Sequence, residues 1–196
     1  MREVGPDAPT LCAGWTTRDL AAHLVVRERR PDTGPGIMLK PLAGYTEKVR
    51  AQAAGKPWDD LLSELAAGPP VWSPFKLVDR WANLAEMFVH HEDVLRGGAA
   101  PDGAWTPRAL SPELEKGLLG PAKSVSKMAL RRSPAATTLQ TPDGQIVAQG
   151  GHGDAVIVAG TPGELLMFAF GRAPLAVDYT GPDAAVAAVK AAKRGF

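Results

Sequence analysis

The chain changes its residue pattern at Pro134, and this change limits the fold more than any other feature of the sequence. Before Pro134, segments with the apolar spacing of helices are separated by breaks rich in Pro and Gly. After Pro134, short apolar runs alternate with turn residues, a pattern typical of strands. We therefore predict an α+β protein with two domains, a helical domain over residues 1–135 and a small α/β domain over residues 136–196.

Capping residues place the helices of the first domain. Thr16 and Asp19 have the spacing of a capping box, and Pro31 ends the helix that they begin. Ser111 and Pro112 form an N-cap and first-turn pair, whereas Gly120-Pro121 is expected to kink or split the helix that follows. The predicted helices cover residues 17–30, 42–54, 58–67, 77–96 and 112–132.

The second domain is predicted to follow the order β-β-β-α-β-α. Its first three strands are expected to form antiparallel hairpins. Thr161 and Glu164 suggest a capping box at the start of the next helix, and Gly171 is expected to stop that helix. The predicted strands cover residues 137–141, 145–149, 155–160 and 175–180, and the last helix covers residues 182–194.

Charge and cysteine content exclude several classes of protein. Lys and Arg number 22 against 21 for Asp and Glu, so no broad positive field exists to attract nucleic acid. Cys12 is the only cysteine and cannot form an internal disulfide, so we expect it to be inert. The chain starts without the apolar run of a signal peptide, and no apolar stretch approaches the roughly 20 residues of a membrane span. We expect a soluble cytoplasmic protein, monomer or homodimer, whose partners are small molecules.

A polar stripe runs along the long helix predicted over residues 77–96. With only one cysteine, a metal ion would have to be held by His and carboxylates, the ligands of catalytic zinc sites. Glu86 and His90 project from consecutive turns of one face, and His23 of the first helix is the natural third ligand. At spacings of four, three, four and three, the stripe comprises Asp79, Asn83, Glu86, His90 and Asp93.

Other interpretations of these residues stay open at this point. A His on an apolar face is more often a core residue, and an E-x-x-x-H pair is more often an exposed ion pair. The HHEDV segment does not match the zinc-peptidase pattern HExxH, because Leu95 stands four residues after His91. Trp15 is expected to be a packing anchor, and His152 is expected to be exposed in a Gly-rich turn.

Two segments, PTLCAGWTTRDLAAHL and AEMFVHHEDVLR, resemble the DinB-like metalloproteins, specifically the mycothiol-dependent maleylpyruvate isomerase family. A third segment, VIVAGTPGELLMFAFGR, looks like the C-terminal domain of that family, which is related in shape to sterol carrier proteins. The chain departs from the family in having only a few residues ahead of Gly5, where a full first helix usually stands. Its HHED and RERRPD segments are more similar to an actinobacterial metal-binding subgroup.

The resemblance implies a four-helix bundle that binds a divalent metal, commonly zinc. The family's metal ligands match His23, Glu86 and His90 here, and its catalytic Arg after a Gly in the C-terminal domain matches Arg172. It also implies a metal-dependent enzyme that uses a small thiol such as mycothiol for isomerisation or S-transfer on an electrophilic substrate. The alternative is a non-catalytic protein that binds a metal or a ligand.

Overall fold

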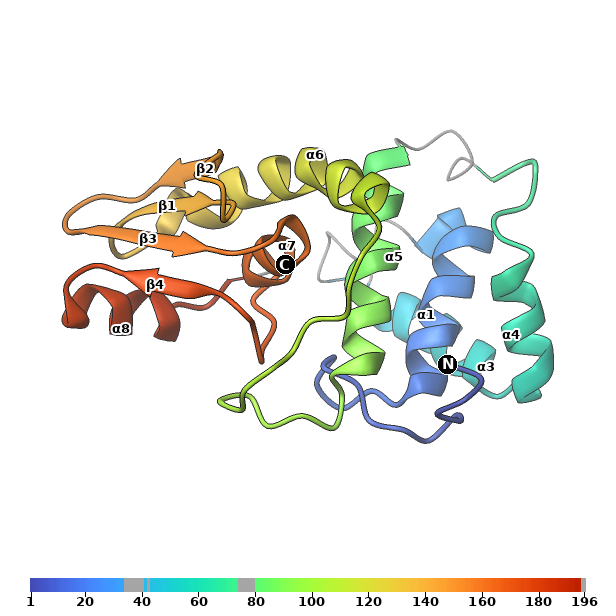
Figure 1. Ribbon diagram of the computed structural model, residues 1–196. Coiled ribbons are helices and arrows are strands. Elements are labelled where there is room, and N and C mark those ends of the chain that lie inside the picture. Colours follow the sequence, from blue (N-terminus) through green and yellow to red (C-terminus); the bar gives the residue numbers. More distant parts are fainter. Residues whose placement is uncertain (34–40, 42, 74–79, 195–196) are drawn as a thin grey trace. The chain divides into compact units, whose positions relative to one another are not determined.

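The computed structural model describes residues 1–33, 41, 43–73 and 80–194. The described residues form an α+β fold, with a four-stranded sheet and seven α-helices (Figure 1). No helix of these described residues combines the length and apolar character that spanning a membrane requires. Leu42 and Asp79, which belong to two of the predicted helices, lie outside the described residues.

The chain divides into two compact units that share one helix. Unit 1 comprises Met1–Arg80 and Glu92–Gly98, and unit 2 comprises Trp81–His91 and Ala99–Phe196. The shared helix is α5, Arg80–Leu95, so most of its length is grouped with unit 2 and its last turn with unit 1. The domain boundary predicted between residues 135 and 136 stays a prediction.

Unit 1 is built on helix α1, Thr17–Arg29, which packs against α3, Ala43–Ala54, and α4, Trp58–Ala66. A short 3-10 turn, η1, follows α1 at Pro31–Thr33. The predicted capping box is present, because the Thr16 side chain accepts from the Asp19 N–H while the Asp19 carboxylate accepts from the Thr16 N–H. The core of this unit comprises Ala21, Ala22, Val25, Val26, Val49, Ala53 and Leu61.

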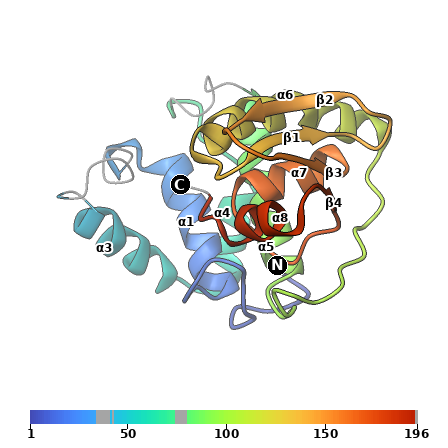
Figure 2. The same ribbon diagram turned by 90° about the vertical axis from the view of Figure 1, so that its left-hand side faces the viewer.

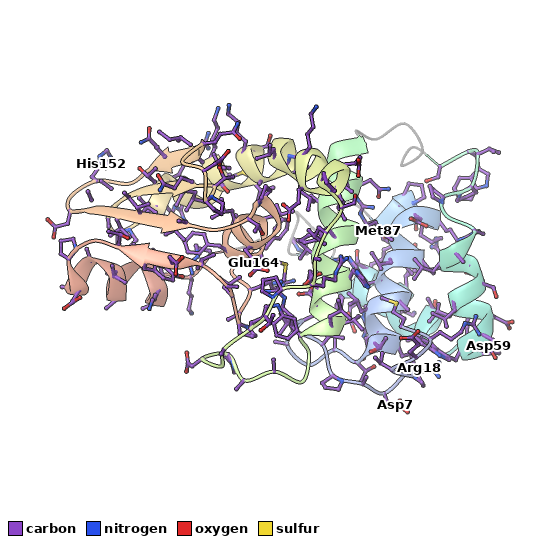
Figure 3. The ribbon with its side chains drawn as sticks, viewed as in Figure 1. Asp7, Arg18, Asp59, Met87, His152 and Glu164 are labelled. Carbon is purple, nitrogen blue, oxygen red and sulfur yellow. The ribbon has the colours of Figure 1, made fainter. Side chains whose placement is uncertain are left out.

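Two arginines of α1 fix the neighbouring helices. Arg18, labelled in Figure 3, donates to the carbonyl oxygens of Ala54 at 3.1 Å and Lys56 at 2.9 Å, where α3 ends. Arg29 donates to the carbonyls of Glu64 and Gly68 at the end of α4. Both guanidinium groups satisfy carbonyls that a helix leaves without a partner at its C-terminal end. The same helix therefore buries an apolar face and holds both of its neighbours by their ends.

Unit 2 holds helix α6, Pro112–Ala129, and the sheet. The 3-10 turn η4, Leu130–Arg132, follows α6 and leads to β1, Ala136–Gln140. The remaining elements are β2, Ile146–Gly150; β3, Ala155–Ala159; α7, Pro162–Ala169; β4, Asp178–Thr180; and α8, Asp183–Ala191. All eight residues of α7 are buried, and α6 packs against α7 and β2 (Figure 2). The predicted order β-β-β-α-β-α is confirmed.

The sheet corrects one prediction. Its strand order is β2-β1-β3-β4, and although β1 pairs with β2 antiparallel, β3 pairs with β1 parallel instead of forming a hairpin with β2. The connection between β2 and β3 must therefore cross the start of β1. It can do so because Gly151 has a φ of +80° and lies so close that a Cβ there would stand 2.0 Å from the Ala135 carbonyl oxygen.

Two smaller predictions for the helices need correction, the split at Pro121 and the capping box at the start of α7. Pro121 does not split α6, which stays one helix around it. Pro121 and Ala122 are buried, and the packing of this face outweighs the roughly 3 kcal/mol that an internal proline costs. At the start of α7, Thr161 caps the helix as predicted, but the Glu164 carboxylate accepts from the Ala176 N–H at 2.8 Å instead of completing a capping box.

Candidate metal centre

Helix α5 brings Glu86 and His90 together. The Nε2 atom of His90 lies 3.8 Å from Oε1 of Glu86, and both side chains are partly buried, with exposed fractions of 12% for His90 and 28% for Glu86. Two ligands of a tetrahedral zinc, each bound at about 2.1 Å, stand about 3.4 Å apart. The observed separation is close to this value, so the pair can serve either as an ion pair or as two ligands of one cation.

Apolar residues next to Glu86 and His90 pack this part of α5 into the protein. Ala85, Phe88 and Val89 are buried, whereas His91 points to an exposed position, as its 100° offset from His90 predicts. The Arg108 guanidinium lies 5.9 Å from the Phe88 ring centroid and contacts Nδ1 of His91 at 3.3 Å. His91 thus contacts Arg108 on the exposed face of α5, away from the face that carries Glu86 and His90.

His23 lies on α1, in unit 1. Its neighbours Leu20 and Leu24 are buried, while His23 itself is half-buried, and its ring centroid lies 5.2 Å from that of Trp15 at a tilt of 49°. It opens on a cavity of about 220 Å³ in unit 1, which it lines with Trp15, Val26, Arg27, Thr33, Ala43, Thr46, Glu47 and Arg50. His23 is therefore accessible to a small ligand, and its membership of a metal site stays a prediction.

Arg50 and Glu47, which line this cavity, belong to a network of ion pairs. Arg50 donates to Asp19 at 2.6 Å and to Glu47, and its guanidinium lies 5.1 Å from the Trp15 ring centroid. Burial acts to raise the pKa of Asp19, but the Thr16 backbone N–H and the Arg50 guanidinium outweigh it and hold that pKa below its usual value. The hydrogen bonds from Arg50 likewise lower the pKa of Glu47. Trp15 thus packs against His23 and Arg50, and it also lines the cavity.

Cys12 takes a place that the sequence did not predict. Its thiol donates to Oδ2 of Asp93 at 3.2 Å, and Asp93, which is fully buried, also accepts from the Leu11 N–H at its backbone carbonyl. Asp93 follows His90 by one helical turn on α5. Cys12 and Asp93 therefore offer a thiol and a carboxylate side by side in unit 1, and the same helix carries His90 one turn before Asp93. Asp93 was visible in the polar stripe, but no local signal linked it to a cysteine 81 residues earlier.

Arg172 lies in unit 2, directly after Gly171, whose φ of +69° ends α7 as predicted. Its Nη1 contacts the Phe170 carbonyl oxygen at 3.5 Å, and the side chain is half-buried. It lines a cavity of about 690 Å³ in the same unit. Among the described residues, neither Glu86 nor His90 contributes to the walls of that cavity. His152 is exposed in the turn between β2 and β3, as predicted (Figure 3).

Comparison with known proteins supports the fold. No protein-family model and no curated protein match the sequence of this chain. The crystal structure of the mycothiol-dependent maleylpyruvate isomerase matches with a TM-score of 0.53 at 16% sequence identity, over 87% of this chain and 80% of that chain. At this identity the likeness shows a shared fold. The α+β fold expected from the sequence motifs is therefore supported by the structure.

Proposed function

We propose that this protein is a metal-dependent enzyme that acts with a small thiol. His23, Glu86 and His90 would hold a divalent ion, zinc, and the reaction would be an isomerisation or an S-transfer on a small electrophile. The observation that carries this proposal is the Glu86–His90 pair on α5, in a chain that shares the fold of a mycothiol-dependent isomerase. Mycothiol is accordingly the first thiol to test.

The donor set fits a catalytic ion better than a structural one. Two imidazoles and one carboxylate are the ligands of several catalytic zinc sites, and three protein ligands leave a coordination position for an exogenous group. A zinc ion at such a site lowers the pKa of a thiol and holds it as the nucleophilic thiolate. The partial burial of Glu86 and His90 also suits a site that a small molecule must reach.

Metal binding and substrate binding would fall to different residues of the chain. Glu86 supplies the negative charge that offsets the cation, and His90 and His23 fix its position from α5 and α1. Arg172 would bind a carboxylate or the enolate oxygen of the substrate, because a planar guanidinium recognises such groups with two parallel hydrogen bonds. The large cavity beside Arg172 gives a substrate room to reach it.

A non-catalytic metal- or ligand-binding protein is the second candidate function. The cavity of Arg172 is lined by described residues that include neither Glu86 nor His90, and this separation favours a protein with two independent binding sites. The two candidates differ in turnover, because only the enzyme consumes a thiol or an electrophile.

The deciding experiment follows the loss of free thiol and the formation of product with the zinc-loaded protein, mycothiol and a panel of small electrophiles. We expect turnover that requires both the metal and the thiol, and that is lost in His90→Ala. His152→Ala is the matched control, because it removes an exposed histidine far from α5 in the sequence. Wild-type inactivity across the panel, with the metal bound, would establish the binding protein instead.

A further inference from the structure

The large cavity of unit 2 is unusually rich in positive charge for a chain whose formal net charge is only +1. Four of its thirteen lining residues are cationic, and Asp102 is the one acidic residue among them. The cations comprise Arg172, Lys190, Lys193 and Arg194. Three of them come from α8 and the residues that follow it, so the sequence places them at spacings of three and one. Such a cluster repels itself unless an anion compensates it.

Arg194 is a partly buried cation that contacts neutral groups. Its Nε donates to the Phe168 carbonyl at 3.1 Å, a second nitrogen donates to the Val189 carbonyl, and the guanidinium lies 4.0 Å from the Phe168 ring centroid. Burial lowers the pKa of this guanidinium. Within the described part of the chain, all of its partners are neutral, and no carboxylate forms an ion pair with it. A partly buried cation with only neutral partners favours an anionic ligand.

Lys190 and Tyr179 complete this wall of the cavity. The Lys190 ammonium lies 4.6 Å from the Tyr179 ring centroid, and that ring packs 6.4 Å from the ring of Phe168. The Tyr179 phenol is protonated at neutral pH and can donate a hydrogen bond, and burial raises its pKa further. The cation–π contact holds the flexible Lys190 side chain over the cavity wall. Lys190 and Arg194 are therefore positioned by aromatic side chains before any ligand arrives.

We propose that this cavity binds a small organic anion with at least two negative charges, a phosphate ester or a dicarboxylate, through Arg194, Lys190 and Lys193. A volume of about 690 Å³ lies in the usual range of roughly 300–1,000 Å³ for small-molecule pockets and exceeds what a single inorganic ion needs. Leu175 and Tyr179 supply an apolar surface for the body of such a ligand. This is the cavity that Arg172 lines, so the inference rests on the proposed function and deepens it by naming the charge of the ligand that the cavity takes. The binding test below needs neither the metal nor turnover, so its failure is distinguishable from failure of the proposed function.

The test is a calorimetric titration of the full-length protein with phenyl phosphate and, separately, with succinate, at constant ionic strength. We expect saturable binding of one molecule of at least one of the two probes per chain. Lys190→Ala combined with Lys193→Ala should raise the Kd at least about tenfold, because it removes two of the four cations. Both lysines are exposed and Ala favours a helix, so the fold should be kept.

The matched control is Lys123→Ala combined with Lys127→Ala. These exposed lysines lie on α6 in the same unit, outside the cavity, so the control changes the net charge equally. Its Kd should stay within about twofold of the wild-type value. Preference for phenyl phosphate would assign a phosphate ester, and preference for succinate would assign a dicarboxylate. Failure of the wild type to bind either probe, or an equal loss in the control variant, would overturn the proposal.

Discussion

The thiol of Cys12 donates a hydrogen bond of 3.2 Å to the buried carboxylate of Asp93, one helical turn after His90 on α5. This contact places a soft ligand beside the face of α5 that carries the proposed metal ligands. We therefore consider a second ligand group, His90 with Cys12 and Asp93, besides the proposed group of His90 with Glu86 and His23. The two ligand groups can be distinguished, because different substitutions should remove the metal in each case.

We predict that the purified protein carries about one divalent ion per chain and that His23→Ala and His90→Ala each lose most of it. Loss of one of three ligands should remove most of the metal affinity. Elemental analysis of dialysed protein measures the content, and His152→Ala serves as the control because that histidine is exposed in the turn between β2 and β3. Full metal retention in both ligand variants would rule out the proposed site.

Glu86→Gln should weaken metal binding without unfolding the protein. The amide keeps the shape of the side chain and loses the charge that offsets the cation. Competition with a chelator gives the affinity, and thermal melts with and without chelator give the stability. An unchanged affinity would mean that Glu86 is only an ion-pair neighbour of His90.

Cys12→Ala distinguishes the two ligand groups. If His23, Glu86 and His90 hold the ion, this variant should keep its metal content near the wild-type value, and its cobalt-substituted form should have the same absorption spectrum. If Cys12 is a ligand, the wild-type cobalt protein should have a thiolate charge-transfer band that the variant lacks. Loss of the metal from Cys12→Ala, together with retention in Glu86→Gln, would move the site to Cys12, His90 and Asp93.

Arg172→Ala should leave the metal content and the fold intact and abolish thiol-dependent turnover. A desolvated guanidinium contact could contribute a few kcal/mol to the transition state, on the order of a hundredfold or more in rate. The measurement is the rate of thiol loss or product formation with the most active electrophile. Arg131→Ala is the control, because it removes an exposed arginine of the same unit. Equal turnover by Arg172→Ala would exclude this residue from the mechanism.

Asp19→Asn should destabilise the protein in a pH-dependent way. The wild-type carboxylate closes the capping box and pairs with Arg50, so its loss should cost about 1 kcal/mol near pH 7. Because the pKa of Asp19 is lowered in the folded state, this stability is complete above its unfolded pKa of about 3.9 and is lost as the pH falls through the folded value. Urea unfolding at pH 7 and at pH 3 or below measures the difference between wild type and variant. The exposed Asp7→Asn should show no comparable difference, and a variant cost that stayed constant with pH would contradict the assignment.

Local patterns predicted the elements well, because their signals lie within a few residues of each other. Thr16 with Asp19, Ser111 with Pro112 and Gly171 each set a helix boundary through contacts that the sequence displays directly. The Glu86–His90 pair was predictable for the same reason, because one turn of helix fixes its geometry.

Local patterns could not predict contacts between residues that are far apart in the sequence. The parallel pairing of β3 with β1 depends on Gly151, which passes close to the Ala135 carbonyl. The alternation of apolar residues in β3 would be the same if β3 paired with β2. Cys12 reaches Asp93 across 81 residues, and the uncompensated Arg194 is visible only once Phe168 and Val189 surround it. These are the features on which the second ligand group and the anion site depend.

Helix α5 gives the chain an interleaved order, because unit 1 is interrupted by Trp81–His91 and then resumes at Glu92. Its last turn is held in unit 1 by Leu11, whose backbone N–H donates to the Asp93 carbonyl at 3.0 Å. A buried ion pair, in which Arg96 donates to Glu92 at 2.8 Å, stabilises the same turn. Neither unit can therefore complete its packing while this one helix is frayed. We expect heat or denaturant to unfold both units in one cooperative transition, with α5 as the element that transmits the loss of order from one unit to the other.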